Sequence, residues 1–416
     1  MLNRIVLTLV FTLSFLSYVA PDLNVTVQLA PLILFAILVF FRVGFSDFVL
    51  IAVDSLFDVE GLILVFGLPI VTLGQSIESN FDRSLPYWGV ISACLLLTRL
   101  YTAVTPLREV FEAFFWSAVA CLAIFLPISF WALQDAISTF VRFAPYNFHP
   151  NLLAWIMAGY FCVLVWKLLT GTWFIKIIAS FGIVICWTIM FFASSRGVII
   201  AVIFGCLTIT AMALVQALRE GRNYFWWIGL TAAVLLLGTF IYVQYQGSIQ
   251  ESYEFVDQVL SLSTKDRGID SGFTGRFDKW ASVMKDLSDG TFLIGRGVRA
   301  SDAMETMIDN SYIVILYDLG LIPLVVIVYR FLIILYESFR GYFIAVTREQ
   351  RHFRLLCTLI VVVALVTNFT ERSLFAVGNP FSLLAFFMLV APTWQFRASA
   401  SHAREGEPLW GRVAVQ

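Results

Sequence analysis

Two arginine-bearing stretches in the most polar part of this sequence have the residue types that bind phosphate. Arg276, in FTGRFDKW, falls in the first turn of a helix that the spacing predicts between 274 and 290. A cation there opposes the helix dipole, whereas the free N–H groups of a helix N-terminus attract phosphate, so a docked anion would explain the arginine. Arg296, flanked by glycines, and Arg299 follow on a flexible loop, where glycine lets the backbone approach a ligand and guanidinium groups grip phosphate in two places. Each of the three could instead be a solvated surface arginine.

Polar residues also mark the ends of several apolar stretches. The cluster DNSY at 309–312 runs directly into an apolar helix, Arg196 follows two serines, His149 precedes a proline, and Glu371 is followed by Arg372. An ionisable residue at membrane depth is a functional candidate by default. Each has a structural alternative: the aspartate of the cluster as a helix cap, the SSRG arginine as a side chain reaching the lipid headgroups, the histidine as a helix-start residue, and the Glu-Arg pair as self-neutralising.

These residues stand in a chain with the composition of a membrane protein. Of its 416 residues, 60% are apolar and only 13% are charged, against about a quarter charged in soluble domains. The apolar runs are about 20 residues long, the length of a membrane-spanning helix rather than of a barrel strand. A net charge of −1 gives no sign of nucleic-acid binding. All six cysteines fall in apolar runs without a C-x-x-C, so we predict neither a disulfide nor a metal site.

The pattern predicts an all-α polytopic membrane protein with about twelve transmembrane helices. The predicted spans are 4–20, 25–43, 48–74, 86–107, 112–133, 151–168, 174–193, 197–217, 225–245, 311–336, 353–370 and 374–394. Acidic residues interrupt the third span, which we expect to be broken or partly re-entrant. The chain then divides into transmembrane helices at 1–245, a large loop with short helices at 246–310, further transmembrane helices at 311–394 and a tail at 395–416.

Lysine and arginine near the span ends predict the orientation of the chain. With the N-terminus in the cytoplasm, most of these cations fall on the cytoplasmic side, including Arg99, Arg330 and Arg354. The opposite short loops hold only Arg83, Arg142, Arg196 and Arg372. Both termini are then cytoplasmic, and the loop at 246–310 lies in the periplasm of a bacterium with an outer envelope.

Taken in order, these features resemble the O-antigen ligase and O-antigen polymerase superfamily, which are GT-C-like integral membrane glycosyltransferases that use polyprenyl-diphosphate-linked glycans. The resemblance covers roughly residues 145–375 and rests on HPNLLAW, SSRG, a large loop with GRFDKW and GRG, and the corner DNSYIVILYDLG. Family ligases carry at this corner a His, then Asn, Ser or Gln, nine residues and Gly; here Asn310 is followed by nine residues and Gly320. Asp309 replaces that His, which favours a polymerase over a lipid A-core ligase.

The resemblance implies transfer of a glycan from undecaprenyl diphosphate onto a lipid-linked repeat unit at the periplasmic face of the bacterial inner membrane. The product would be an exopolysaccharide, a capsule or O-antigen. The diphosphate is a good leaving group, so the protein mainly holds and neutralises it; this role would fall to Arg196, Arg276, Arg296 and Arg299. The acceptor hydroxyl needs a base within hydrogen-bond reach, for which Asp309 is the first candidate and Glu371 the second.

Four further residues would contact the glycan on this interpretation: Asn310, Tyr312, His149 and Trp280. The tryptophan could stack on a sugar ring or simply belong to the core of the loop. The resemblance implies no metal or other cofactor, and as partners the lipid-linked oligosaccharide, the bilayer and possible companions such as a flippase and a chain-length regulator. Two alternatives stay open: a ligase that moves finished glycan to a terminal acceptor, and a transporter of a polar solute, which would show charges in mid-span and paired halves.

Overall fold

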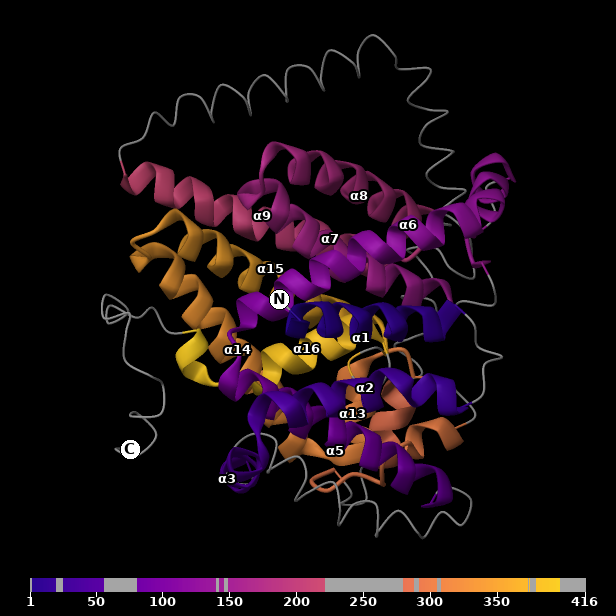
Figure 1. Ribbon diagram of the computed structural model, residues 1–416. Helices are drawn as coiled ribbons and strands as arrows, with labels where there is room; N and C mark the ends of the chain where they lie inside the picture. Colours follow the sequence, from indigo (N-terminus) through magenta and orange to yellow (C-terminus); the bar gives the residue numbers. More distant parts are fainter. Residues whose placement is uncertain are drawn as a thin grey trace.

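The computed structural model describes residues 2–19, 25–55, 81–139, 142–145, 149–220, 280–287, 292–304, 308–372, 374 and 379–396. The described residues are helical (Figure 1). Their helices are α1 (Leu2–Val19), α2 (Val25–Val43), α3 (Phe45–Ser55), α5 (Phe81–Val104), α6 (Leu107–Thr139), α7 (Pro150–Thr170), α8 (Trp173–Phe192), α9 (Arg196–Arg219), the short η5 (Ala300–Ala303), α13 (Ser311–Leu319), α14 (Leu321–Ile344), α15 (Arg348–Thr370), α16 (Pro380–Val390) and the short η6 (Thr393–Gln395).

Among the described residues, seven helices are long and apolar enough to cross a membrane: α5, α6, α7, α8, α9, α14 and α15. Shorter apolar helices accompany them within α1, α2 and α16. The chain is therefore an all-α, multi-pass membrane protein. The predicted span at 225–245 and most of the one at 48–74 lie outside the described residues, so the number twelve stays a prediction.

The long helices pack side by side, with α7 and α15 at the centre. Figure 1 shows α6, α7, α8 and α9 as neighbouring rods, and α15 packs against both α7 and α9. Most of α7 and α15 is buried, whereas α8, α9 and α14 leave most of their apolar surface exposed. Exposed apolar faces of this kind suit contact with lipid chains.

The span predicted at 311–336 is broken into two helices at Gly320, so that α13 precedes the candidate membrane span α14. Gly320 has φ 89° and ψ −179°, a region that essentially only glycine adopts. A Cβ at this position would overlap the carbonyl of Leu293. The Leu321 N–H donates to the Phe292 carbonyl at 3.0 Å, which binds the loop directly to the break.

In the described part of the last predicted span, 374–394, the α-helix runs from Pro380 to Val390. Asn379 caps its start by accepting hydrogen bonds from two backbone N–H groups. Pro392 ends it, because proline lacks an N–H and disfavours helical geometry in the preceding residue. α16 is therefore too short to cross a bilayer by itself.

Arginines from three other helices bind carbonyl groups at the end of α16 and in η6, which follows it. These bonds run from Arg99 Nη1 to Val390 O at 2.9 Å, from Arg330 Nε to Leu389 O at 2.7 Å and from Arg354 Nη1 to Gln395 O at 3.1 Å. All three side chains are buried. These arginines satisfy backbone groups inside the bundle and so stabilise the fold. They are therefore weaker evidence for the predicted orientation, which counts cations in the loops at the membrane surface.

Candidate functional site

One end of the bundle, called the loop end from here on, brings together segments that are far apart in the sequence. It is the end at which α7, α9 and α13 begin and α15 ends. The start of α9 lies directly on the end of α15, because a Cβ on Gly197 would overlap the Thr370 side chain. The start of α13 meets the same place, since the Ser311 hydroxyl donates to the Glu371 carbonyl at 2.7 Å and to Asn368 Oδ1 at 2.8 Å.

A chain of hydrogen bonds at the loop end holds the Glu371 carboxylate. Asn151 Nδ2 donates to Glu371 Oε2 at 2.8 Å, and Asn151 Oδ1 accepts a hydrogen bond from Arg142 Nη2. Arg142 Nε also donates to the Ala193 carbonyl at 2.7 Å, in the turn that leads into α9. Glu371 is only 8% exposed. This chain fixes the position of a predicted catalytic carboxylate beside the turn that carries Arg196.

His149 and Asp309 lie within electrostatic range of each other at the same end. His149 precedes α7, ahead of the candidate membrane span. Desolvation and the positive charge of Arg142 lower the pKa of His149, and the Asp309 carboxylate opposes this effect. A lowered pKa keeps the imidazole neutral at pH 7, so it can accept a proton or a hydrogen bond.

The first residues of α13 show which side chain caps that helix. Asn310 Oδ1 accepts hydrogen bonds from the N–H groups of Tyr312 at 2.9 Å and Ile313 at 3.1 Å, so Asn310 is the N-cap. The structural alternative of Asp309 as the cap is therefore wrong, and capping belongs to the next residue. The helix begins after this N-cap, at Ser311, so Asp309 lies outside it.

Two other predicted glycan contacts have partners within the protein. The Tyr312 hydroxyl donates to the Leu365 carbonyl of α15 at 2.7 Å. Trp280 meets Phe369 edge to face, with ring centroids 5.4 Å apart, and packs against the core of the loop. Trp280 therefore packs as part of the core of the loop, which was the structural alternative to stacking on a sugar.

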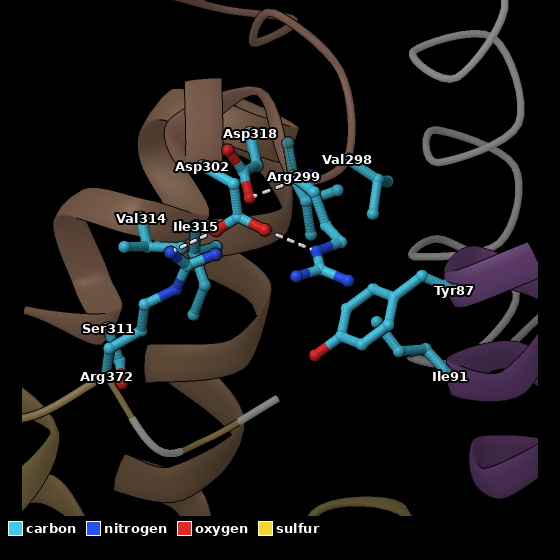
Figure 2. A pocket seen from close by; sticks show the side chains of 11 residues that line it. Tyr87, Ile91, Val298, Arg299, Asp302, Ser311, Val314, Ile315, Asp318 and Arg372 are labelled. Atoms are coloured by element: carbon cyan, nitrogen blue, oxygen red, sulfur yellow. Dashed lines mark hydrogen bonds and ion pairs between the residues drawn. The ribbon is translucent and has the colours of Figure 1, made fainter. Parts of the chain in front are cut away.

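A cavity of about 290 Å³ opens between α5, the loop and α13 (Figure 2). Figure 2 shows the Asp302 carboxylate between two guanidinium groups. Arg372 Nη1 lies 2.5 Å from Asp302 Oδ1, and Arg299 Nε donates to the other carboxylate oxygen. The Arg299 guanidinium also lies 4.8 Å from the centre of the Tyr87 ring. Glu371 and Arg372 therefore turn to different partners, one toward α7 and the other into this cavity.

Asp318 sets the shape of the loop beneath this cavity. Its carboxylate accepts hydrogen bonds from the backbone N–H groups of Arg299 at 3.0 Å and Ser301 at 2.9 Å. Arg299 itself has the left-handed backbone conformation, with φ 64°. Burial raises the pKa of Asp318 to about 6, although the charge of Arg372 and the N–H donors oppose the rise.

The glycines around Arg296 bring the loop backbone close to α13. The Gly297 N–H donates to the Asp318 carbonyl at 3.0 Å, and a Cβ on Gly295 would lie 2.5 Å from the same oxygen. These glycines were predicted to let the loop backbone approach a ligand closely. In the structure, the backbone approaches α13 of the same protein. Arg296 forms an ion pair with Asp286, Nε to Oδ2 at 3.2 Å, and does not line the cavity.

The structure brings together three of the predicted residues, His149, Asp309 and Glu371, and places Arg196 beside them as the first residue of α9. Arg276 lies outside the described residues. Sequence reasoning missed five side chains that shape the loop end: Tyr87, Arg142, Asn151, Asp302 and Asp318. A usable signal was present for Asp318, because an acidic residue inside an otherwise apolar stretch needs a local partner.

Neither protein-family models nor curated proteins match this chain. The residues of the loop end and the order of the motifs are therefore what indicates a function.

Proposed function

We propose that this chain is a polysaccharide polymerase, a metal-independent membrane glycosyltransferase that transfers glycan from undecaprenyl diphosphate onto a lipid-linked repeat unit. The observation that supports this best is the convergence at the loop end. His149, Arg196, Asp309 and Glu371 come from four separate segments, and all lie at that end. Such a gathering of ionisable groups at one end of apolar helices is expected of a site that handles a polar headgroup and a glycan.

In the proposed reaction, the acceptor hydroxyl oxygen bonds to the anomeric carbon of the donor glycan as the bond from that carbon to the diphosphate oxygen breaks. The bonding electron pair leaves with the diphosphate, whose negative charge is neutralised by arginines. Arg196 and Arg276 are assigned this role. Arg299 is paired with Asp302, and Arg296 is paired with Asp286. The proton of the acceptor hydroxyl passes to a carboxylate.

Glu371 and Asp309 remain the two candidates for this base. Glu371 has the support of a fixed geometry, because Asn151 and Arg142 hold it in place. Asp309 has the support of its neighbour His149, whose neutral imidazole could receive the proton in turn. Both carboxylates lie where α13 and α15 meet, so either can serve an acceptor bound at the same place.

The proposal includes a location and partners. The protein would lie in the bacterial inner membrane with its termini in the cytoplasm and the loop end in the periplasm. The loop at 246–310 would cover the glycan, and the lipid tail would lie against the exposed apolar faces of the helices. A flippase would deliver the lipid-linked unit, and a chain-length regulator would act with the polymerase.

The test is complementation of a deletion strain with variants of two arginines. Arg196→Ala and Arg276→Ala should each abolish polymer while the protein still inserts, and normal polymer in either variant would remove that arginine from the mechanism. The deletion strain itself separates the alternatives. Accumulated single-repeat lipid-linked units indicate a polymerase, and accumulated full-length lipid-linked polymer indicates a ligase. Solute uptake by reconstituted vesicles, without glycan products, would indicate a transporter.

A further inference from the structure

We infer that the cavity between α5, the loop and α13 binds one uncharged saccharide ring of the glycan substrate. That this ring belongs to a lipid-linked glycan rests on the proposed function. The preference for a neutral saccharide over a phosphate group rests on the cavity itself. Three features of the cavity support this preference: its size, its mixture of apolar and charged lining, and the balance of its charges.

The cavity has the size and the mixed lining that a sugar ring requires. At about 290 Å³ it lies just below the range of ligand pockets, which is about 300–1,000 Å³, so it suits a single ring rather than a long ligand. The lining combines apolar side chains with charged groups. The apolar side chains are Ile91, Val298, Val314, Ile315 and Leu319. Sugar rings have the same combination, with C–H groups on their faces and hydroxyls at their edges.

The charges of the lining are already balanced without a ligand. Arg299 and Arg372 share the Asp302 carboxylate, and Asp318 adds a second carboxyl group to the lining. A diphosphate would add at least two negative charges to a cavity whose two cations are neutralised, and it would have to displace Asp302. A neutral saccharide needs no such displacement.

The polar groups of the cavity match the hydrogen bonding of sugar hydroxyls. Guanidinium groups only donate hydrogen bonds, and an ionised carboxylate only accepts them. A hydroxyl both donates and accepts, so adjacent hydroxyls can bridge Asp302 and either neighbouring arginine. The ion pairs hold these planar groups in place before the ligand arrives, which lowers the entropy cost of binding.

The cavity adjoins the proposed site of transfer. Ser311 lines the cavity, and its hydroxyl donates to the Glu371 carbonyl at 2.7 Å. Arg372, which also lines the cavity, directly follows Glu371 in the chain. A ring bound in the cavity is thus held next to the segment that presents the candidate base.

The experiment uses the full-length protein in phosphatidylcholine nanodiscs and saturation-transfer difference NMR. The probes are methyl glycosides of glucose, galactose, mannose, rhamnose and N-acetylglucosamine, with inorganic diphosphate as the competitor. At least one neutral glycoside should bind, and diphosphate should not displace it. Asp302→Asn and Arg372→Gln should each weaken that binding by about tenfold, the loss of one hydrogen bond to a charged group, about 1.4 kcal/mol. Ile91→Phe, which narrows the cavity without touching an ion pair, should weaken it as well.

Arg351→Gln is the matched control. Arg351 pairs with Glu220 at the other end of the bundle, with side chains 23% and 24% exposed, against 31% and 27% for Arg372 and Asp302. It should bind the glycoside as the wild type does. The inference is overturned if no glycoside binds, if diphosphate displaces the glycoside, or if all variants bind it equally.

These outcomes are separable from the fate of the proposed function. Glycoside binding that Arg372→Gln weakens, in a protein that transfers no glycan from a lipid diphosphate, would refute the polymerase and leave the saccharide cavity standing. Glycan transfer by a protein whose binding is unaffected by Arg372→Gln and Ile91→Phe would do the reverse.

Discussion

The arginines that meet the end of α16 and the arginines of the loop end bind different kinds of partner, although one side-chain pair, Arg351–Glu220, also lies at the end of the bundle where α16 stops. At the opposite end, where α16 stops, Arg99 and Arg330 donate to backbone carbonyls of that helix. At the loop end, Arg142 donates to the side chain of Asn151, and Arg372 pairs with the side chain of Asp302. The first kind of partner is part of the backbone, and the second is a side chain that can move.

This difference separates a structural role from a functional one. A helix that ends inside a bundle leaves carbonyls without partners, and each unsatisfied buried group costs about 1–3 kcal/mol, so the arginines of the opposite end stabilise the fold. The Arg372–Asp302 pair, with side chains 31% and 27% exposed, is in contact with water, and such an ion pair contributes only about 0–1 kcal/mol to stability. Stability therefore explains this pair poorly, and binding explains it better. Four changes test this contrast.

Replacing the loop-end carboxylate should give the largest effect. We expect Glu371→Gln to lower the rate of glycan transfer by about 10²–10⁴-fold, the contribution of a general base, with little change in stability. Transfer between lipid-linked repeats by purified protein measures the rate, and thermal unfolding in detergent measures the stability. Glu349→Gln, in an exposed pair with Arg108, is the control and should transfer normally. A fully active Glu371→Gln would leave Asp309 as the base.

At the opposite end, Arg330→Met should lower the stability and leave the rate of glycan transfer unchanged. It leaves the carbonyls of Leu389 and Ala391 without their donor and should lower the free energy of unfolding by about 2–5 kcal/mol. The variant that remains folded should transfer glycan at the rate of the wild type, measured per folded molecule. A stable but inactive Arg330→Met protein would break the comparison, because it would give this arginine a role in function.

Asp318 should make the stability of the folded protein depend on pH. Its pKa of about 6 in the folded protein exceeds that of an unfolded aspartate, about 3.9, so ionisation costs the folded state free energy. The stability contributed by this group is highest below about pH 4 and falls as the pH rises to about 6, by about 3 kcal/mol. Asp318→Asn should lack this fall. Unfolding of both proteins from pH 4 to 7 measures it, and parallel curves would contradict the pKa.

Gly320→Ala should have the smallest effect and should be confined to the joint between loop and helix. The backbone conformation at Gly320 costs alanine about 1–3 kcal/mol, and the new Cβ would press on the Leu293 carbonyl. The free energy of unfolding should fall by that amount. Gly89→Ala, in a helical position with no atom near the added Cβ, should be neutral or stabilising. Equal effects of the two changes would show that the joint tolerates a side chain.

Much of the fold was predictable from the sequence, because the length of an apolar run is a local property. The runs that became α7, α9 and α15 were placed within a few residues of their observed bounds. The errors fall where the tertiary structure acts on the backbone. The predicted span at 311–336 is broken because the loop binds Leu321, and the span at 374–394 is shortened because Asn379 and Pro392 delimit a helix that other helices cap.

The site was predictable only in its parts. His149, Asp309 and Glu371 stood out because ionisable residues are rare at the ends of apolar stretches. Their partners Asn151 and Asp302 did not stand out, because nothing in the neighbouring sequence distinguishes them. Their role becomes visible only when a segment distant in the sequence lies against them. The sequence also did not reveal that Asn310, predicted to contact the glycan, caps α13 through its side-chain carbonyl oxygen.

The sequence by itself determined that this chain is a helical membrane protein and which rare polar residues it places at the ends of its helices, because both follow from composition and from distances along the chain. Only the tertiary structure decided which of these residues meet. A hydrogen bond between Asn151 and Glu371 joins positions 220 residues apart, and its geometry depends on how α7 and α15 pack. The packing of α5, the loop and α13 created the cavity in which Asp302 lies between two arginines, and no local pattern encodes a space that distant segments line together.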